Sequence, residues 1–569
     1  MRPLASADLD RPWRLDFHQP RGVVPLGLTV IDDITAGSRT AAAALGVDGG
    51  LVARLVGCHV YLGPAADGIP GGEAGPPGGG TSGIPAAGFG VNPLVPGGDP
   101  AAYAVRFRAL WSELSAELHD QLAALDALPL ADLDAGGLLD AWRQARAVCS
   151  RAWRLHFAVM YPVFAVHEWV LAGMAAEGIS ALEASALIEV PDHTIARTDR
   201  ALADLAAFAA TEGLESIFLH SPSGQLLHRL QAEPRAQRWL ERFAEFDTAY
   251  GQRSAAVGDL DSPSWHESPS IPLGLVRAAL VAGPSTARPA RPPVPLRDRF
   301  DAAAAARVQD WLDIAAQAPA AWWNEEHNVL IDLRAHLPLR AVALAAGRHL
   351  GLPAAEDALY LHESELLGLL AGDVPSAAVG ALIEQRRAVV ESWRERRHDL
   401  PGHLGAPGDG GDIVLRQILG TPDARPSPDG QVDAIGPRPD HPAWSRRPRL
   451  PELEGMGVSP GLARGRARVL ASADDIDQLE RGEVLVCEAT SPSWTPAFDR
   501  VAAAVCDAGG MLTHAAIVSR EYGLPCVCAV LDATALIRTG DLLLVDGDLG
   551  VVRVLERASA VDEDSGGMP

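Results

Sequence analysis

Basic residues, cysteines and long hydrophobic runs are all scarce in this sequence of 569 residues. Its 48 basic residues, all of them arginine, stand against 73 acidic residues, which gives a formal net charge of -25. Nucleic-acid binders hold phosphates with clustered basic side chains, so this balance argues against that class. The N-terminus, "MRPLASADLDRPWRLDF", has no apolar signal core, and no run of about 18 apolar residues occurs. We therefore expect a cytoplasmic protein without a membrane partner.

The six cysteines are too few and too scattered for a disulfide framework. Cys526 and Cys528 are two residues apart, so on a strand both face the same side, where we expect small core residues. The chain has no GxxxxGK[ST] nucleotide loop. Several histidines show no HExxH-like or other metal-binding spacing, so we expect no metal site. These histidines are His18, His59, His156, His167, His220 and His228.

The composition and the apolar periodicity of the sequence change several times along the chain. Residues 63–100 are rich in Gly and Pro and predict a mobile loop. Apolar residues three and four apart predict helices from about 101 to 250 and from about 298 to 398. After Glu454, short runs of Val, Leu and Ala between Gly, Pro and Asp predict strands, with one helix at about 514–522 and a shorter one at 473–479.

The expected fold class is therefore multidomain: a mostly helical domain followed by a small C-terminal α/β domain. The predicted boundaries are a helical domain at 1–400, a flexible linker rich in Pro and Gly at 401–450, the α/β domain at 451–557 and a disordered acidic tail at 558–569. A linker of that length permits large movements between the two domains.

The stretch "CDAGGMLTHAAIVSREYGLPCV", Cys506 to Val527, places His514 at a predicted helix start. Gly509 and Gly510 allow a tight turn, and Thr513 is a favourable N-cap residue. Backbone N–H groups of a first helical turn have no intrahelical partner, so this position suits an anion and disfavours an imidazolium cation. The pattern favours a neutral, nucleophilic His514 that could carry a phosphoryl group. A histidine that only helps to start the helix is the simpler alternative.

Four segments in order extend this pattern: "GMGVSPGLARGRARVL", "GEVLVCEATSPSWTPAF", "AAAVCDAGGMLTHAAIVSREYGLPCV" and "GDLLLVDGDLGVVRVL". Together they cover about 455–556 and resemble the swivelling phosphohistidine domain of the phosphoenolpyruvate-utilising enzymes. The resemblance implies that His514 is the phosphorylated residue and that Thr513, Gly509 and Gly510 shape its loop. It places Thr490 and Trp494 in a neighbouring loop.

The preceding region resembles the helical substrate-binding domain of rifampin phosphotransferase and its relatives. The segments are "WRLDFHQPRGVVP", "FDTAYGQRSAAVGDLDSPSWHESP", "WWNEEHNVLIDLRAHLPLRAVALAAGRHLG" and "EDALYLHESELLGLL". Their polar and aromatic members are the candidate substrate-binding residues: Arg253, Asp259, Trp265, Glu267, Glu325 and His327. Each also has a structural alternative, since Arg253 and Asp259 could pair, Trp265 could be core and His327 could cap a helix.

The layout is closest to rifampin phosphotransferase and to the histidine-bearing component of phenylphosphate synthase, without an ATP-grasp domain. The resemblance implies an enzyme in which His514 carries a phosphoryl group to a hydroxyl or carboxyl of a small organic acceptor. His327 or Glu325 would act as the general base, and Arg253 would supply positive charge. ATP and Mg²⁺ are expected through a separate ATP-grasp partner protein. A phosphorylation-driven dehydratase or ligase of secondary metabolism, and a non-catalytic binding or regulatory homologue, are the alternatives.

Overall fold

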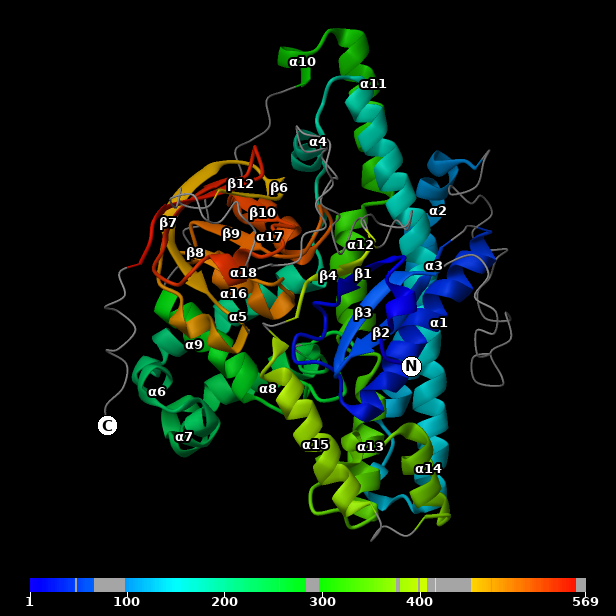
Figure 1. Ribbon diagram of the computed structural model, residues 1–569. Coiled ribbons are helices and arrows are strands. Elements are labelled where there is room, and N and C mark those ends of the chain that lie inside the picture. The colour runs from blue at the N-terminus through cyan, green and yellow to red at the C-terminus, as the bar shows by residue number, and fades with distance from the viewer. Residues whose placement is uncertain are drawn as a thin grey trace, which may run out of the picture. The chain divides into compact units, whose positions relative to one another are not determined.

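The structure is a computed structural model (Figure 1). The residues it describes are 1–46, 49–65, 98–254, 256–282, 296–374, 379–397, 400–406, 415, 452–471 and 473–558. They pack into two compact units, each assembled from separate stretches of chain. The first unit comprises Met1–Gly173, Gly251–Glu267 and Gln309–Leu415, and the second comprises Met174–Tyr250, Ser268–Val308 and Arg416–Pro569.

The first unit contains a four-stranded antiparallel sheet in the order β2-β3-β1-β4. Its strands are β1 (Pro12–Leu15), β2 (Leu51–Val56), β3 (His59–Pro64) and β4 (His403–Gly405). A two-residue turn joins β2 to β3, and its first residue, Gly57, has a φ of 63°, which a type II′ turn requires. A Cβ at Gly57 would overlap the indole of Trp393, so only glycine fits there. Trp13 and Tyr61 form the centre of the small core on this sheet.

Helices make up most of the first unit. They are α1 (Leu28–Leu45), α2 (Pro100–Asp126), α3 (Ala135–Ala176), α11 (Ala302–Gln317), α12 (Ala320–His327), α13 (Leu337–His349), α14 (Glu363–Ala371) and α15 (Gly380–Arg394), and α3 and α11 each cross a unit boundary. Between α12 and α13 lies a π-helical turn, η6 (Asn328–Asp332). The predicted helical regions at 101–250 and 298–398 are thus confirmed.

Helix α3 is the longest element in Figure 1 and spans 42 residues. By length and composition it could cross a membrane, with an 18-residue window of mean hydropathy 1.4. However, 67% of that window is buried inside the structure, and the core helix of a soluble protein passes the same test. One such helix is weak evidence for membrane insertion, and its burial favours a core role.

The second unit joins another set of helices to the C-terminal sheet. The helices are α4 (Ala181–Leu187), α5 (Thr194–Thr211), α6 (Glu215–His220), α7 (Leu226–Ala232), α8 (Gln237–Tyr250), α9 (Ser270–Ala282) and α10 (Leu296–Arg299). Amphipathic helix α8 shows why they pack: it buries Trp239, Phe243 and Phe246 on one face.

Eight strands form the C-terminal sheet, in the order β5-β12-β11-β7-β8-β9-β10-β6. They are β5 (Glu452–Glu454), β6 (Met456–Ser459), β7 (Leu462–Val469), β8 (Val484–Cys487), β9 (Ala503–Cys506), β10 (Cys526–Cys528), β11 (Leu542–Asp546) and β12 (Val551–Glu556). The short helical segments are η12 (Ala473–Gln478), η13 (Pro492–Trp494), α16 (Thr495–Phe498), α17 (His514–Tyr522) and α18 (Ala533–Leu536). The α/β character and the two helices predicted here are confirmed.

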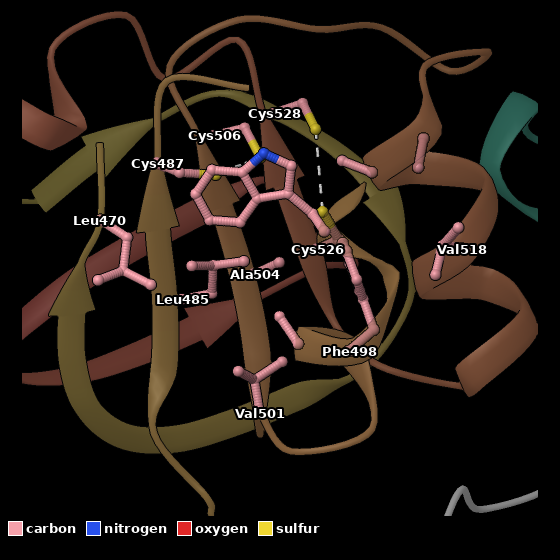
Figure 2. Close-up of a cluster of buried hydrophobic side chains, with 14 of the residues drawn as sticks. Leu470, Leu485, Cys487, Phe498, Val501, Ala504, Cys506, Val518, Cys526 and Cys528 are labelled. Atoms are coloured by element: carbon pink, nitrogen blue, oxygen red, sulfur yellow. Dashed lines mark hydrogen bonds between the residues drawn. The ribbon is translucent and has the colours of Figure 1, made fainter. Parts of the chain in front are cut away.

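The central strands β7, β8, β9 and β10 run parallel. Of these, β8, β9 and β10 are buried on both faces. Burial on two faces explains why their sequences are continuously apolar instead of alternating. Four cysteines lie together on one of these faces, as Figure 2 shows: Cys487, Cys506, Cys526 and Cys528. The Sγ atoms of Cys526 and Cys528 are 3.8 Å apart, and all six cysteines are free and buried. The predicted core role of Cys526 and Cys528 is confirmed.

The unit boundaries differ from the predicted domains. Residues 174–250 and 268–308 pack with the second unit, so the predicted helical domain, 1–400, is divided. The prediction of a linker from 401 does not hold for His403–Gly405, because β4 pairs with β1. Most of 401–450, the loop at 66–97 and the tail from 559 lie outside the described residues.

Candidate functional site

His514 is the first residue of α17, at the end of the loop that follows β9. Gly509 has a φ of 119°, and a Cβ there would lie 3.0 Å from Thr513 Oγ1. Glycine therefore lets the chain turn sharply between the strand and the helix. Gly510 is not among the glycines with positive φ, so the predicted need for glycine is met at Gly509 and not at Gly510.

The imidazole of His514 is held between α16 and α17. His514 is buried, with only 4% of its surface exposed. Thr495 Oγ1 lies 3.3 Å from His514 Nε2 and also donates to the Pro492 carbonyl oxygen at 2.9 Å. The ring of Phe498 meets the imidazole edge-on, with centroids 6.3 Å apart and an interplanar angle of 89°. These contacts orient the ring at the start of α17.

Thr513 occupies the N-cap position, as predicted, with extended backbone at φ -73° and ψ 157°. Its side chain does not cap the helix, because Oγ1 donates to the Gly510 carbonyl oxygen at 2.8 Å. Without a side-chain cap, the first-turn N–H groups of α17 can serve an oxyanion.

Sequence reasoning named Thr490 and Trp494 for the neighbouring loop but missed Thr495. Thr490 is buried, and its Oγ1 has no hydrogen-bond partner among the described residues. Trp494 is buried in the core on the face that carries the cysteines. Thr495 is the residue of this segment whose hydroxyl reaches the imidazole. Its place one residue after Trp494 was visible in the sequence, but only the α16 turn shows that it faces His514.

A half-buried carboxyl group, that of Asp507, anchors the same loop. Asp507, directly after β9, accepts a hydrogen bond from the Thr534 N–H at 3.0 Å and another from the Thr534 hydroxyl. Burial raises the pKa of Asp507 to about 8, although the two hydrogen bonds from Thr534 work in the opposite direction. Asp507 therefore holds a proton at neutral pH and ties the β9–α17 loop to α18.

The candidate substrate-binding residues Arg253, Asp259, Trp265 and Glu267 all lie in the first unit. The Arg253 guanidinium lies over the Trp265 ring, with Cζ 4.9 Å from the centroid, and both residues are buried. Burial, reinforced by the nearby charge of Asp261, raises the pKa of Asp259 to about 6. These three side chains are built into the interior of the unit.

Glu267 has a clear structural role. Its Oε2 accepts from the Ser264 N–H at 2.9 Å, and the Ser264 hydroxyl accepts from the Glu267 N–H at 3.1 Å. Its carboxylate also pairs with Arg340 Nε at 3.1 Å. Arg340 in turn donates to the Leu260 carbonyl oxygen at 2.7 Å. Glu267 thus fixes the 260–267 loop against α13.

Glu325 and His327 both lie on α12 and are both buried. Residues two apart on a helix point to different faces, so these two side chains do not converge on one point. The ring of His327 stacks on Trp323, with centroids 4.0 Å apart and an interplanar angle of 16°. Its Nδ1 lies 3.0 Å from the Trp323 carbonyl oxygen, which can only accept, so Nδ1 carries the proton of this hydrogen bond.

The structure brings His327 together with two residues that sequence reasoning did not single out, His156 and Asp332. Asp332 Oδ1 lies 3.1 Å from His156 Nδ1, and Asp332 Oδ2 lies 3.6 Å from His327 Nε2. The two imidazole rings meet edge-to-face with centroids 4.5 Å apart.

Charge and burial shift the pKa values of this cluster in opposite directions. Burial by itself raises the pKa of Asp332, but the imidazoles of His156 and His327 outweigh it and hold the pKa well below its usual range. Burial lowers the pKa of His156 to about 4, although the Asp332 carboxylate opposes this. Within the cluster, the neighbouring histidines thus favour the ionised form of Asp332, and burial favours the neutral form of His156.

Spacing rules could not reveal this cluster, because His156 is on α3, far from the other two residues in sequence. The expectation of no metal site rested on such spacing and stays a prediction.

Comparisons with known proteins match two regions of the chain. Residues 479–550 match the mobile domain of PEP-utilising enzymes, and residues 155–340 match the fourth domain of rifampicin phosphotransferase. The first match contains His514, and the second contains Arg253, Glu325 and His327. Both expected resemblances are thereby confirmed.

Three relatives illustrate the range of similarity. Chondramide synthase of Chondromyces crocatus is 30% identical over 78% of this chain and 12% of its own length. An uncharacterized phosphotransferase of Bacillus subtilis is 25% identical over 76% of this chain and 51% of its own length. Phosphoenolpyruvate synthase of Pyrococcus furiosus is 47% identical over 18% of this chain and 12% of its own length. The chain therefore spans about half or less of each of these relatives.

Proposed function

We propose that this chain, which carries the mobile domain of the phosphoenolpyruvate-utilising enzymes, transfers a phosphoryl group from His514 to a small organic acceptor. The acceptor atom is an oxygen of a hydroxyl or carboxyl group, and the acceptor binds in the helical part of the chain. The region that matches the rifampicin phosphotransferase fourth domain supports this placement.

The observation that carries the proposal is the position of His514. It begins α17, its ring is oriented by Thr495, and no side chain caps the helix in front of it. The uncapped N–H groups and the helix dipole favour an anionic phosphoryl group at this point. A histidine that merely started a helix would not need the hydrogen bond to Thr495.

The transfer takes two steps. In the first, an imidazole nitrogen of His514 attacks the donor phosphorus in-line, so an N–P bond forms and the bond to the donor's leaving group breaks. In the second, the acceptor oxygen attacks, an O–P bond forms, and the N–P bond breaks to return His514. The proton of an acceptor hydroxyl must move to a base as this happens.

Of the two candidate bases, the geometry supports His327 over Glu325. His327 faces Asp332 and His156, whereas Glu325 points to a different side of α12. Positive charge near the transferring group must come from arginine or a bound cation, because the sequence contains no lysine. Arg253 remains our candidate, with its guanidinium positioned by Trp265.

The phosphoryl donor in this proposal is ATP with Mg²⁺, bound by a separate ATP-grasp partner. Phosphoenolpyruvate is the other donor that the mobile-domain match supports. The region that follows β4, residues 406–450, connects the parts of the chain between which the phosphoryl group travels, and its Pro- and Gly-rich composition suits a movable connection.

The similarity to part of chondramide synthase favours a second candidate, which uses the same His514 chemistry. In that case the phosphorylated acceptor is an activated intermediate, and loss of phosphate accompanies a dehydration or a condensation in secondary metabolism. Detection of a dehydrated or coupled product, with inorganic phosphate released, selects this branch.

The proposal is tested by incubating the full chain with γ-³²P-ATP, β-³²P-ATP or ³²P-phosphoenolpyruvate, with and without the products of neighbouring genes. We expect acid-labile label on the wild-type chain and none on His514→Ala. His220→Ala, which alters an exposed histidine of α6, is the matched control and should label as wild type. Absence of label with every donor and partner contradicts the proposal.

A further inference from the structure

We propose that His156, His327 and Asp332 bind one divalent first-row transition-metal ion, of the class of Zn²⁺ or Fe²⁺, inside the first unit. Two imidazoles and one carboxylate are a common donor set for these ions, and three protein ligands leave a coordination position for water or substrate. The three ligand atoms all lie within 4.8 Å of one another.

The hydrogen-bonding atoms of His327 and Asp332 that face each other indicate a cation between them. His327 Nδ1 donates to the Trp323 carbonyl oxygen, and in the tautomer with its proton on Nδ1 the Nε2 atom presents a lone pair. That lone pair faces Asp332 Oδ2, another acceptor, at 3.6 Å. Two buried acceptors that face each other repel unless a proton or a metal ion lies between them.

The third proposed ligand, His156, also lacks a well-formed hydrogen bond. His156 Nδ1 lies 3.1 Å from Asp332 Oδ1, which is an ion-pair distance, but the contact lacks hydrogen-bond geometry. His327 Nε2 has no hydrogen-bond partner among the described residues. The three residues are only 4%, 1% and 5% exposed for His156, His327 and Asp332, so bulk water does not compensate. One ion would satisfy all three atoms.

The separations fit metal coordination. Metal–ligand bonds of about 2.0–2.2 Å at tetrahedral or octahedral angles place neighbouring ligand atoms roughly 3.0–3.5 Å apart. The 3.1 Å separation lies within this range, and the 3.6 Å separation lies just beyond it. The third pair of ligand atoms lies within 4.8 Å, so the site closes around an ion by rotation of the side chains.

The backbone explains how two of the ligands come to share a face. His327 ends α12, and the π-helical turn Asn328–Asp332 follows it, closed by the Leu333 N–H to the Asn328 carbonyl oxygen at 2.9 Å. The wider π turn brings residues five apart into alignment, whereas an α-helix would separate them. Such π-turns cost stability and occur mostly at functional sites.

The surroundings resemble the outer shell of a metal centre. The hydrogen bond from His327 Nδ1 to a carbonyl oxygen is the usual way to fix the orientation of a ligating imidazole. The aromatic rings of Trp153, Phe157 and Trp323 pack around the two histidines. The Asp332 carbonyl oxygen accepts from the Gly258 N–H at 2.9 Å, which anchors the π turn.

The phosphorylation of His514 does not require this ion, but the ion would take the place of His327 as the general base of the second step. If the ion is present, His327 Nε2 is a ligand and not a proton acceptor, and the metal itself can activate an acceptor oxygen. The metal content of the chain and the labelling of His514 are separate measurements, so either proposal can fail without the other.

The test is metal analysis of the purified full chain after chelation and reloading with one equivalent of Zn²⁺ or Co²⁺. We expect about one bound ion per chain and the visible absorption of low-symmetry Co²⁺. Asp332→Asn keeps the shape of the side chain but weakens its donor, and we expect at least a tenfold loss of affinity. His327→Gln and His156→Gln should behave alike.

The matched control is His349→Gln, which alters an exposed histidine of α13 and should bind the ion as wild type. Circular dichroism of each variant establishes that it is folded. A wild-type chain that takes up neither ion, or a folded Asp332→Asn variant with unchanged affinity, overturns the inference.

Discussion

Thr495 Oγ1 and His514 Nε2 lie 3.3 Å apart, and through this contact α16 orients the imidazole at the start of α17. The hydroxyl bridges two groups, since it also donates to the Pro492 carbonyl oxygen. Both residues are buried, so the orientation does not depend on solvent. The reactive histidine of the proposal is thus held in place before any donor arrives.

Replacing Thr495 with valine tests this positioning. Thr495→Val keeps the shape and removes the hydroxyl, so we expect initial phosphorylation of His514 to slow by about fivefold, which corresponds to about 1 kcal/mol for a neutral hydrogen bond. The initial rate of label incorporation at saturating donor measures this.

The control for that experiment is Thr490→Val, because Thr490 Oγ1 is buried without a hydrogen-bond partner among the described residues. Its loss should leave the labelling rate unchanged and the folded state as stable or slightly more stable. Equal rates for wild type and Thr495→Val, with both proteins folded, would argue against the positioning role.

The turn before His514 should tolerate only glycine at Gly509. An alanine there must adopt a φ of 119° and bring its Cβ to 3.0 Å from Thr513 Oγ1. We expect Gly509→Ala to lower the free energy of unfolding by about 1–3 kcal/mol and to slow labelling. Urea denaturation checks the first effect, with Gly274→Ala in open space on α9 as a control that should lose no stability.

The stability of the second unit should fall as pH rises from about 4 to about 8. Burial raises the pKa of Asp507 to about 8 in the folded state, against about 3.9 for an unfolded aspartate. Between these values the native state holds a proton that the unfolded state has lost, so stability decreases with rising pH. This contribution is complete below about pH 4 and is lost as pH passes about 8.

Asp507→Asn removes that proton equilibrium while it preserves hydrogen bonding to Thr534. We expect urea midpoints of this variant to vary less with pH across the same window than those of wild type. Asp298→Asn, at an exposed position of α10, should keep the wild-type pH profile. A wild-type profile in Asp507→Asn contradicts the assignment.

Glu267 should prove structural and not a substrate ligand, contrary to its place among the sequence candidates. Glu267→Ala removes acceptors for the Ser264 N–H and for Arg340, so we expect a loss of about 1–2 kcal/mol in the free energy of unfolding. A double-mutant cycle with Arg340→Ala isolates the pair. Unchanged stability with a raised KM for the acceptor would restore the substrate-binding interpretation.

Local patterns in the sequence correctly predicted those features of the structure that depend on interactions between nearby residues. The start of the helix at His514, the strands around it and the shared face of Cys526 and Cys528 follow from glycine, N-cap and period-two signals. The direction of the Thr513 hydroxyl was not predictable in this way, because an N-cap position does not decide which backbone group the side chain meets.

Features that depend on contacts between residues far apart in sequence could not be predicted from the sequence. The pairing of β4 with β1 joins the two ends of the first unit, and no local signal marks it. The cluster of His156, His327 and Asp332 depends on a π turn and on the packing of α12 against α3. Neither the turn nor the contact leaves a periodic pattern in the sequence, so spacing rules overlooked two of the three residues.

The central claim is that His514 carries the phosphoryl group, and site mapping tests it most directly. The full chain is incubated with the donor that labels it, digested under alkaline conditions that preserve phosphohistidine, and fragmented by electron-transfer mass spectrometry. We expect one phosphoryl group, on the imidazole of His514, that disappears when the acceptor is added. A phosphoryl group on any other residue, or an unmodified His514 in a chain that still turns over the acceptor, would contradict the account.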